Sequence, residues 1–350
     1  MTATSARRRF AGIDYLRAVF SVCVVVVHLG YVSPSAIFDE ERYADHTFTW
    51  SDFVNFYLLC LAVPVFVLIS TYLYALKPTD SAGLGRRLGR IVRLLVFWSV
   101  LYQIFFYTGY GFPKLIPHDA HGLTLYLITG GNTVYYFFIS LAVVTVVTHG
   151  VRDLPSATVW ALFALSTLLV GVMPILHEVL RPQTAWAMLL GLHANPLNFL
   201  PLAFAGVGLT RLVQAEETRL LDRIGIAALG LGAVAAILDW TVYVDPCFFE
   251  VNRFALPAYT RPSLVFLAIA VLVLAVRARP AGNPVIAFMA RHSLAVYCLH
   301  PFFVPVRYKM AQVLHLSGAA EVLVPLPIVL GLSYGASVVL PWFLRDEVLR

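Results

Sequence analysis

Apolar residues occur in long runs that are separated by short polar or charged stretches. Most of these runs are close to the ~20 residues that a helix needs to cross the hydrocarbon core of a bilayer. Ten runs are recognised, at positions 10–32, 52–76, 90–110, 133–149, 156–176, 196–213, 222–243, 261–278, 292–311 and 322–344. A further apolar stretch at 122–129 is an alternative to the fourth run, as a re-entrant or surface helix. The pattern predicts an all-α membrane protein, a polytopic bundle of about ten transmembrane helices.

Lys and Arg residues are divided unevenly between the polar stretches. With the N-terminus inside, seventeen lie in cytoplasmic segments and seven on the opposite side. The positive-inside rule therefore predicts that both termini are cytoplasmic, and it puts the acidic stretch 39–45 outside. We expect a single transmembrane domain over 1–350, without a soluble C-terminal domain, in the plasma or inner membrane.

The composition supports the membrane class and excludes several others. The chain is 60% hydrophobic and 13% charged, with a mean hydropathy of +0.80, whereas soluble domains have about 25% charged residues. The net charge of +6 comes from short basic clusters beside apolar runs, which membrane orientation explains, so nucleic-acid binding is not expected. The four cysteines are scattered and form no CxxC pair, so neither a disulfide framework nor a metal site is predicted.

The first apolar run carries four polar residues that share one helical face. Asp14 and Ser21 lie three residues before and four after Arg17, and His28 lies eleven residues after it. On a helix, Arg17 and His28 would be about three turns and ~16 Å apart. Ionisable residues in a span usually face the bundle interior, so we predict a site. The alternatives are a simple Asp14–Arg17 pair and a neutral histidine at the outer interface.

A basic cluster leads into the third run and contains Arg86, Arg87, Arg90 and Arg93. Membrane orientation alone would account for much of it. Its continuation into the apolar run at helical spacing also fits the binding of a phosphorylated molecule, because arginine binds phosphate through two donors. The chain contains no glycine-rich phosphate-binding loop of the known patterns.

The ninth run contains a third polar set. Ser293, Tyr297 and His300 are spaced by four and three residues and share a face. We take Tyr297 and His300 as candidates for substrate binding or oxyanion stabilisation. Ser70 of the second run is placed with them as a substrate-binding residue. The alternative for the ninth run is polar contact between helices, and for Ser70 it is packing.

With these motifs the chain resembles the acyltransferase-3 family of integral-membrane acyltransferases, whose members typically have ten transmembrane helices. The matching segments, in order, are Ile13–Arg17 followed ten residues later by His28, then Val63–Ser70, Arg86–Ile91, Asn198–Gly206 and Ser293–His300. The chain departs from the family pattern at Thr71, where a glycine is usual, and at 134–138, which lacks the usual histidine. These departures bear on the identity of the molecule that receives the acyl group more than on the reaction itself.

The resemblance implies O-acylation, usually O-acetylation, of a cell-surface carbohydrate or lipid-linked glycan, with cytoplasmic acyl-CoA as the donor and no bound cofactor. The arginines of the third run would hold the CoA phosphates, and the pantetheine arm would run alongside Arg17. His28 would act as general base, because an imidazole with an ordinary pKa near 6.5 is neutral at pH 7. Asp14 would orient Arg17.

Two hypotheses from other functional classes stay open. A transporter or flippase for a lipid-linked or polar substrate would use the same charged face as a path, although the sequence shows no pair of inverted-repeat halves. A non-catalytic membrane scaffold has no need of aligned ionisable residues. Consumption of acyl-CoA separates an acyltransferase from both. The sequence predicts no particular oligomeric state.

Overall fold

The computed structural model describes a chain that is helical throughout and has no strand in its described residues, which confirms the predicted all-α class. These residues are 3–30, 54–77, 79–107, 120–131, 133–180, 190–243, 258–278 and 280–340. The acidic stretch 39–45 and Cys247 lie outside them. The helices form two compact units, one built from the described residues within 1–66 and 217–340 and the other from those within 67–216.

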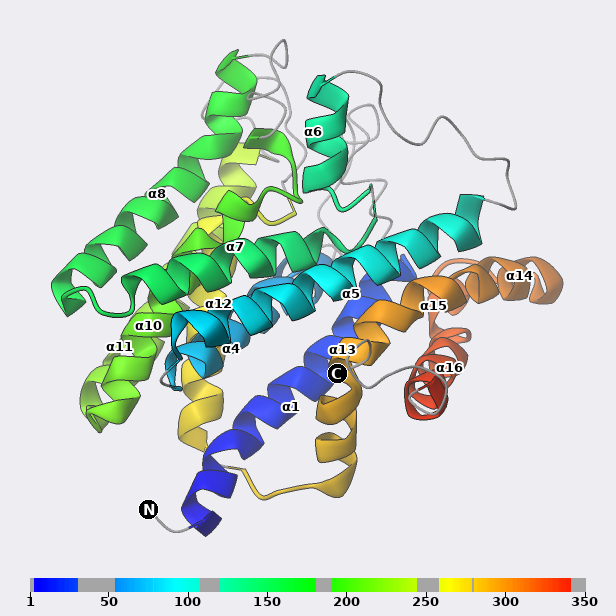
Figure 1. Ribbon diagram of the computed structural model, residues 1–350. Helices are drawn as coiled ribbons and strands as arrows, with labels where there is room; N and C mark the ends of the chain where they lie inside the picture. The colour runs from blue at the N-terminus through cyan, green and yellow to red at the C-terminus, as the bar shows by residue number, and fades with distance from the viewer. Residues whose placement is uncertain are drawn as a thin grey trace. The chain divides into compact units, whose positions relative to one another are not determined.

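The first unit contains the N-terminal helix and the C-terminal third of the chain. Its elements are α1 (Ala3–His28), η2 (Val54–Leu59), the first residues of α4 (Ala62–Ala75), α11 (Thr218–Tyr243), α12 (Pro262–Ala278), α13 (Pro284–Phe303), α14 (Pro305–Leu314), α15 (Ala320–Leu323) and α16 (Leu326–Val339). In this unit α1 packs along α13 and α12, α13 packs on α16, and α11 packs on α12 (Figure 1).

Two features show how closely α1 is packed. A side chain at Gly12 would overlap the backbone carbonyl of Ala275 on α12, so only glycine allows this approach of the two helices. Toward the other end of α1, Val25 and Leu29 pack with Val296 of α13 in a fully buried apolar cluster. The predicted first span is thus the central helix of its unit.

The second unit contains the rest of α4 and the elements that follow it. These are α5 (Ser81–Tyr107), α6 (Ala120–Ile128), α7 (Tyr136–Val151), α8 (Ser156–Leu180), η4 (Pro196–Phe199) and α10 (Leu200–Gln214). Here α7 packs on α5 and α10, and α8 packs on α10 (Figure 1). The Thr71 hydroxyl donates to the carbonyl of Leu202 at 3.0 Å, and Gly206 lies directly against Thr71.

Seven helices in the described residues are long and apolar enough to span a membrane. They cover 11–28, 54–75, 81–106, 156–177, 196–214, 218–239 and 320–339. Two shorter apolar helices, α7 and α12, coincide with the fourth and eighth predicted runs, and α6 coincides with the alternative stretch 122–129. Multiple spans are therefore supported, whereas ten spans and cytoplasmic termini remain predictions.

The predicted bounds of the ninth run are wrong. A single helix over 292–311 was expected, but α13 begins at Pro284, where the Asn283 side chain accepts from two backbone N–H groups. It ends at Phe303, and Pro305 begins the separate helix α14. Proline suits the first turn of a helix because the missing N–H would have no partner there. Apolar periodicity continues across this break and hides it in the sequence.

Candidate functional site

The predicted base, His28, is the last residue of α1. The helix is closed by the bond from Leu29 N–H to the Val25 carbonyl and by Gly30, whose φ of 66° is the left-handed conformation that favours glycine. His28 Nδ1 lies 2.8 Å from the Val24 carbonyl oxygen, one turn back. Because a carbonyl can only accept, the neutral ring carries its proton on Nδ1 and presents the Nε2 lone pair. His28 is half-buried.

The structure brings His28 together with His300 of α13. The centroids of the two imidazoles are 4.7 Å apart, with an angle of 56° between the ring planes. His300 Nδ1 lies 3.1 Å from the Val296 carbonyl oxygen, so this ring is held in the same way as His28. His300 is 0% exposed, and its Nε2 has no hydrogen-bond partner in the described residues.

Ser293 and Tyr297, the other two residues of the polar set of the ninth run, are buried in α13. The ring of Tyr297 lies 6.0 Å from that of His300, and the Ser293 hydroxyl donates to the Ala290 carbonyl at 2.9 Å. His300 exposes no surface to an acceptor and Tyr297 exposes only 7% of its own. Their predicted role in substrate binding remains untested, but this burial favours contact with α1 over contact with a large ligand.

Asp14 and Arg17 lie one turn apart on α1, and both are half-buried. Their opposite charges attract each other. The ion pairs within the described residues, with N–O distances up to 4.0 Å, do not include a pair between these two. Ser21, the third polar residue of this face, forms a 2.8 Å hydrogen bond between its Oγ and the Tyr334 hydroxyl of α16. Ser21 therefore joins helices.

The second unit holds the basic cluster on α5. Arg87 is half-buried and turned toward α4, where its Nη2 donates to the Ser70 hydroxyl at 2.6 Å and to the Ser70 carbonyl at 3.4 Å. Its guanidinium carbon lies 4.7 Å from the centre of the Tyr74 ring, in a cation–π contact. The sequence placed Ser70 and Arg87 in different roles, one for the acceptor and one for the donor, but the structure joins them.

The remaining arginines of the cluster are exposed on α5. Arg86, Arg90 and Arg93 follow one another at spacings of four and three. Arg86 lies 4.0 Å from Asp80 in an exposed ion pair, which contributes little to stability. The cluster therefore combines one half-buried arginine with three exposed ones.

Two functional candidates escaped the sequence analysis. Tyr74, which supports Arg87, also hydrogen-bonds through its hydroxyl to Nδ1 of His149 on α7 at 3.0 Å. Arg261, one of the seven basic residues that the charge count put on the outer side, is 0% exposed and donates through Nη2 to the Phe56 carbonyl at 2.8 Å. Neither residue stands in a recognisable motif. A tyrosine in an apolar run and a basic residue beside a proline carry no signal of their own.

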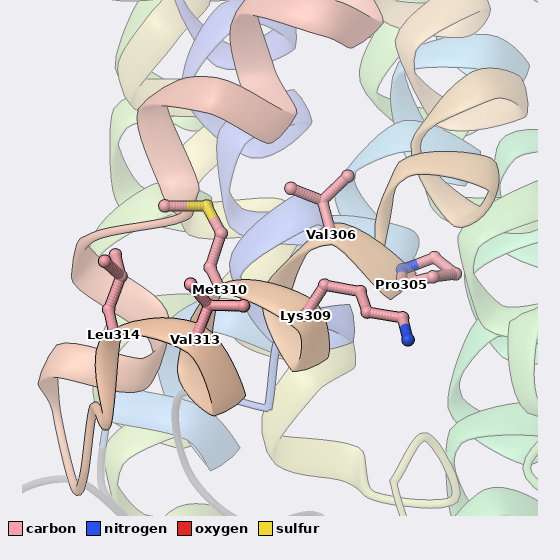
Figure 2. A pocket seen from close by; sticks show the side chains of 6 residues that line it. All are labelled: Pro305, Val306, Lys309, Met310, Val313 and Leu314. Carbon is pink, nitrogen blue, oxygen red and sulfur yellow. The ribbon is translucent and has the colours of Figure 1, made fainter.

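A groove of about 470 Å³ lies along α14, and no predicted site residue is among those that line it. It is lined by Pro305, Val306, Lys309, Met310, Val313 and Leu314 (Figure 2). Figure 2 shows the Lys309 amine extending toward the Pro305 end of the helix. The lining is otherwise apolar, so the groove offers no reactive group. In the described residues no three His, Cys, Asp or Glu side chains gather as a metal site would require.

Comparison with known proteins gives one match. A family model described as an acyltransferase domain, Acyl_transf_3, matches residues 10–346, which is nearly the whole chain. The match includes all the residues singled out above. No curated protein and no solved structure matches the chain.

Proposed function

We propose that this chain, which belongs to the Acyl_transf_3 family of acyltransferases, is a membrane O-acyltransferase of the cell membrane that uses acyl-CoA. It would transfer an acyl group, in the first instance acetyl, to a hydroxyl of a cell-surface carbohydrate or lipid-linked glycan. The observation that carries this proposal is the hydrogen bond made by the ring of His28. Its Nδ1 is engaged with a backbone carbonyl, which leaves Nε2 as a base.

In the proposed reaction, Nε2 of His28 removes the proton of the acceptor hydroxyl while the oxygen attacks the thioester carbonyl. The bond between carbon and sulfur then breaks, and the proton passes from His28 to the sulfur of the departing CoA. The products are an ester and free CoA. A positioned base of this kind contributes typically about 10²- to 10⁴-fold to the rate.

The position of His28 at the end of α1 suits this role. Its ring becomes positively charged when it takes the proton, and the C-terminal end of a helix carries partial negative charge. Cations in the last turn of a helix are stabilised by about 0.3–1 kcal/mol in exposed settings and by more when partly buried. The last turn of α1 therefore favours the protonated form of His28 as it forms.

The basic cluster of α5 would bind the phosphate groups of the donor. Arg87 supplies a guanidinium whose orientation is fixed by Ser70 and Tyr74. Arg90 and Arg93 supply exposed positive charge on the same helix. Arginine suits this role because its planar donors match phosphate oxygens in pairs.

The proposal is tested with purified protein in proteoliposomes, supplied with acetyl-CoA and assayed for free CoA. We expect turnover by the wild type and a loss of at least about 100-fold in His28→Ala. His315→Asn is the matched control, because His315 is an exposed histidine of the same unit with φ 50°, a conformation that asparagine tolerates. Unchanged acetyl-CoA in the presence of folded wild type would contradict the proposal and favour transport.

A further inference from the structure

The helices that surround His28 carry almost no acidic residues. In serine hydrolases a carboxylate accepts the Nδ1 proton of the catalytic histidine and stabilises its charged form. No Asp or Glu occurs in η2, α12, α13 or α16. On α1 the only acidic residue is Asp14, which lies fourteen residues, or about 21 Å along the axis, from His28. Beyond the Val24 carbonyl and the end of α1, these described helices therefore offer a charged His28 no carboxylate.

The group that lies against His28 is the imidazole of His300. The other ionisable side chains on the helices packed around the pair include Arg17 and Cys23 on α1, Arg277 on α12, Arg291, His292, Tyr297 and Cys298 on α13, and Tyr334 on α16. The His28 ring lies nearer to His300 than the Tyr297 ring does, with centroid distances of 4.7 Å and 6.0 Å.

The hydrogen bonds define what His300 can offer to its neighbour. Its Nδ1–H donates to the Val296 carbonyl, so Nε2 carries the lone pair, which is the negative end of the ring dipole. This nitrogen is buried, and the described part of the chain supplies no donor to it. A buried acceptor without a donor is unfavourable, and it becomes favourable when a positive charge or a donor appears beside it.

We propose that His300 is a positioning residue for the base. Its neutral ring holds the His28 ring in place, and its Nε2 lone pair stabilises the imidazolium that His28 becomes when it takes the proton of the acceptor. This inference rests on the proposed function and adds to it the group that replaces a carboxylate. No proton moves to His300. The proton goes from the hydroxyl to His28 and then to the sulfur of CoA.

Two substitutions separate this role from simple packing. His300→Phe keeps a ring against His28 but removes both nitrogens, whereas His300→Gln loses the ring but supplies a carbonyl dipole that can face a charged His28. We expect kcat for CoA release from acetyl-CoA to fall about 10- to 100-fold in His300→Phe with an unchanged KM, because a dipole that stabilises the charged ring is lost. His300→Gln should keep more activity than His300→Phe.

The matched control is His292→Phe on the same helix. His292 hydrogen-bonds to Ser337 of α16 at 3.0 Å and stacks on Phe288, so its loss tests packing of α13 without touching the pair. Its kcat should stay within about twofold of wild type. His300→Phe with wild-type kcat, or His300→Gln less active than His300→Phe, would overturn the inference while leaving the proposed function intact.

A measurement on the wild type does not depend on how the variants fold. NMR of protein labelled with ¹⁵N in its histidines should show the proton of His300 on Nδ1 and none on Nε2. A proton on Nε2 would overturn the inference, because that nitrogen could not then accept. If folded wild type releases no CoA from acetyl-CoA and His28 substitution changes nothing, the proposed function itself fails, and the inference with it.

Discussion

The close approach of α1 and α12 at Gly12 leads to a prediction about stability and activity together. In Gly12→Ala the new methyl group would lie 2.6 Å from the carbonyl carbon of Ala275 and would overlap its oxygen. Ordinary van der Waals contact begins at 3.4 Å, so the backbones must separate locally by about 0.8 Å or more. Both partners are backbone atoms of helices, and neither can be moved by rotating a side chain.

Overpacking of this kind typically costs about 1–3 kcal/mol. The helical propensity of alanine offsets at most about 1 kcal/mol of that cost. We therefore expect Gly12→Ala to lower the thermal unfolding midpoint in detergent by several degrees. Because α1 carries His28, we also expect a lower kcat for CoA release, since displacements near 1 Å at a reacting group can cost about 100-fold.

The matched control is Gly230→Ala on α11, in the same unit. A side chain at Gly230 would meet nothing within 4 Å, so only the propensity gain of about 0.5–1 kcal/mol remains. The two alanine substitutions should therefore shift the unfolding midpoint in opposite directions. Equal midpoints for Gly12→Ala and wild type would refute the packing argument, because such an overlap cannot be accommodated without cost.

Two further predictions concern buried cations. Arg87→Lys keeps the charge but loses the paired N–H groups and the bond to Ser70, so KM for acetyl-CoA should rise about 10- to 100-fold with little change in kcat. The control is Arg223→Lys on the exposed side of α11, for which KM should not change. An unchanged KM in Arg87→Lys would speak against the binding of acetyl-CoA by Arg87. Arg261→Met should lower the free energy of unfolding by about 1–3 kcal/mol, because the buried Phe56 carbonyl loses the guanidinium that donates to it. An unchanged free energy of unfolding would contradict this reason.

The sequence predicted the helical class and most helix positions, because apolar runs of membrane length leave little choice of structure. The first run illustrates this point, since α1 carries Asp14, Arg17 and His28 on one unbroken helix as the spacing indicated. The ninth run shows the limit of the method. Both halves of 292–311 are helical, and the proline at 305, as the first residue of a new helix, marks the break.

The pairing of site residues could be predicted only in part. His28 and His300 were each singled out, but they lie 272 positions apart, and no local pattern states that their rings meet. The contact between Ser70 and Arg87 depends on how α4 and α5 pack in the second unit, which periodicity does not specify. The burial of Arg261 was missed because a charge beside an apolar run looks the same whether it faces water or a carbonyl.

The most direct test of the central claim follows the acyl group itself. Membranes from cells that produce wild-type protein or His28→Ala are given acetyl-CoA labelled in the acetyl group, and the carbohydrate and lipid fractions are analysed for bound label. The account predicts alkali-labile acetyl ester in one of these fractions, in step with the release of CoA, and its absence with folded His28→Ala. Equal labelling with both proteins would contradict the role of His28, and no labelled ester with folded wild type would contradict the acetyl transfer proposed here.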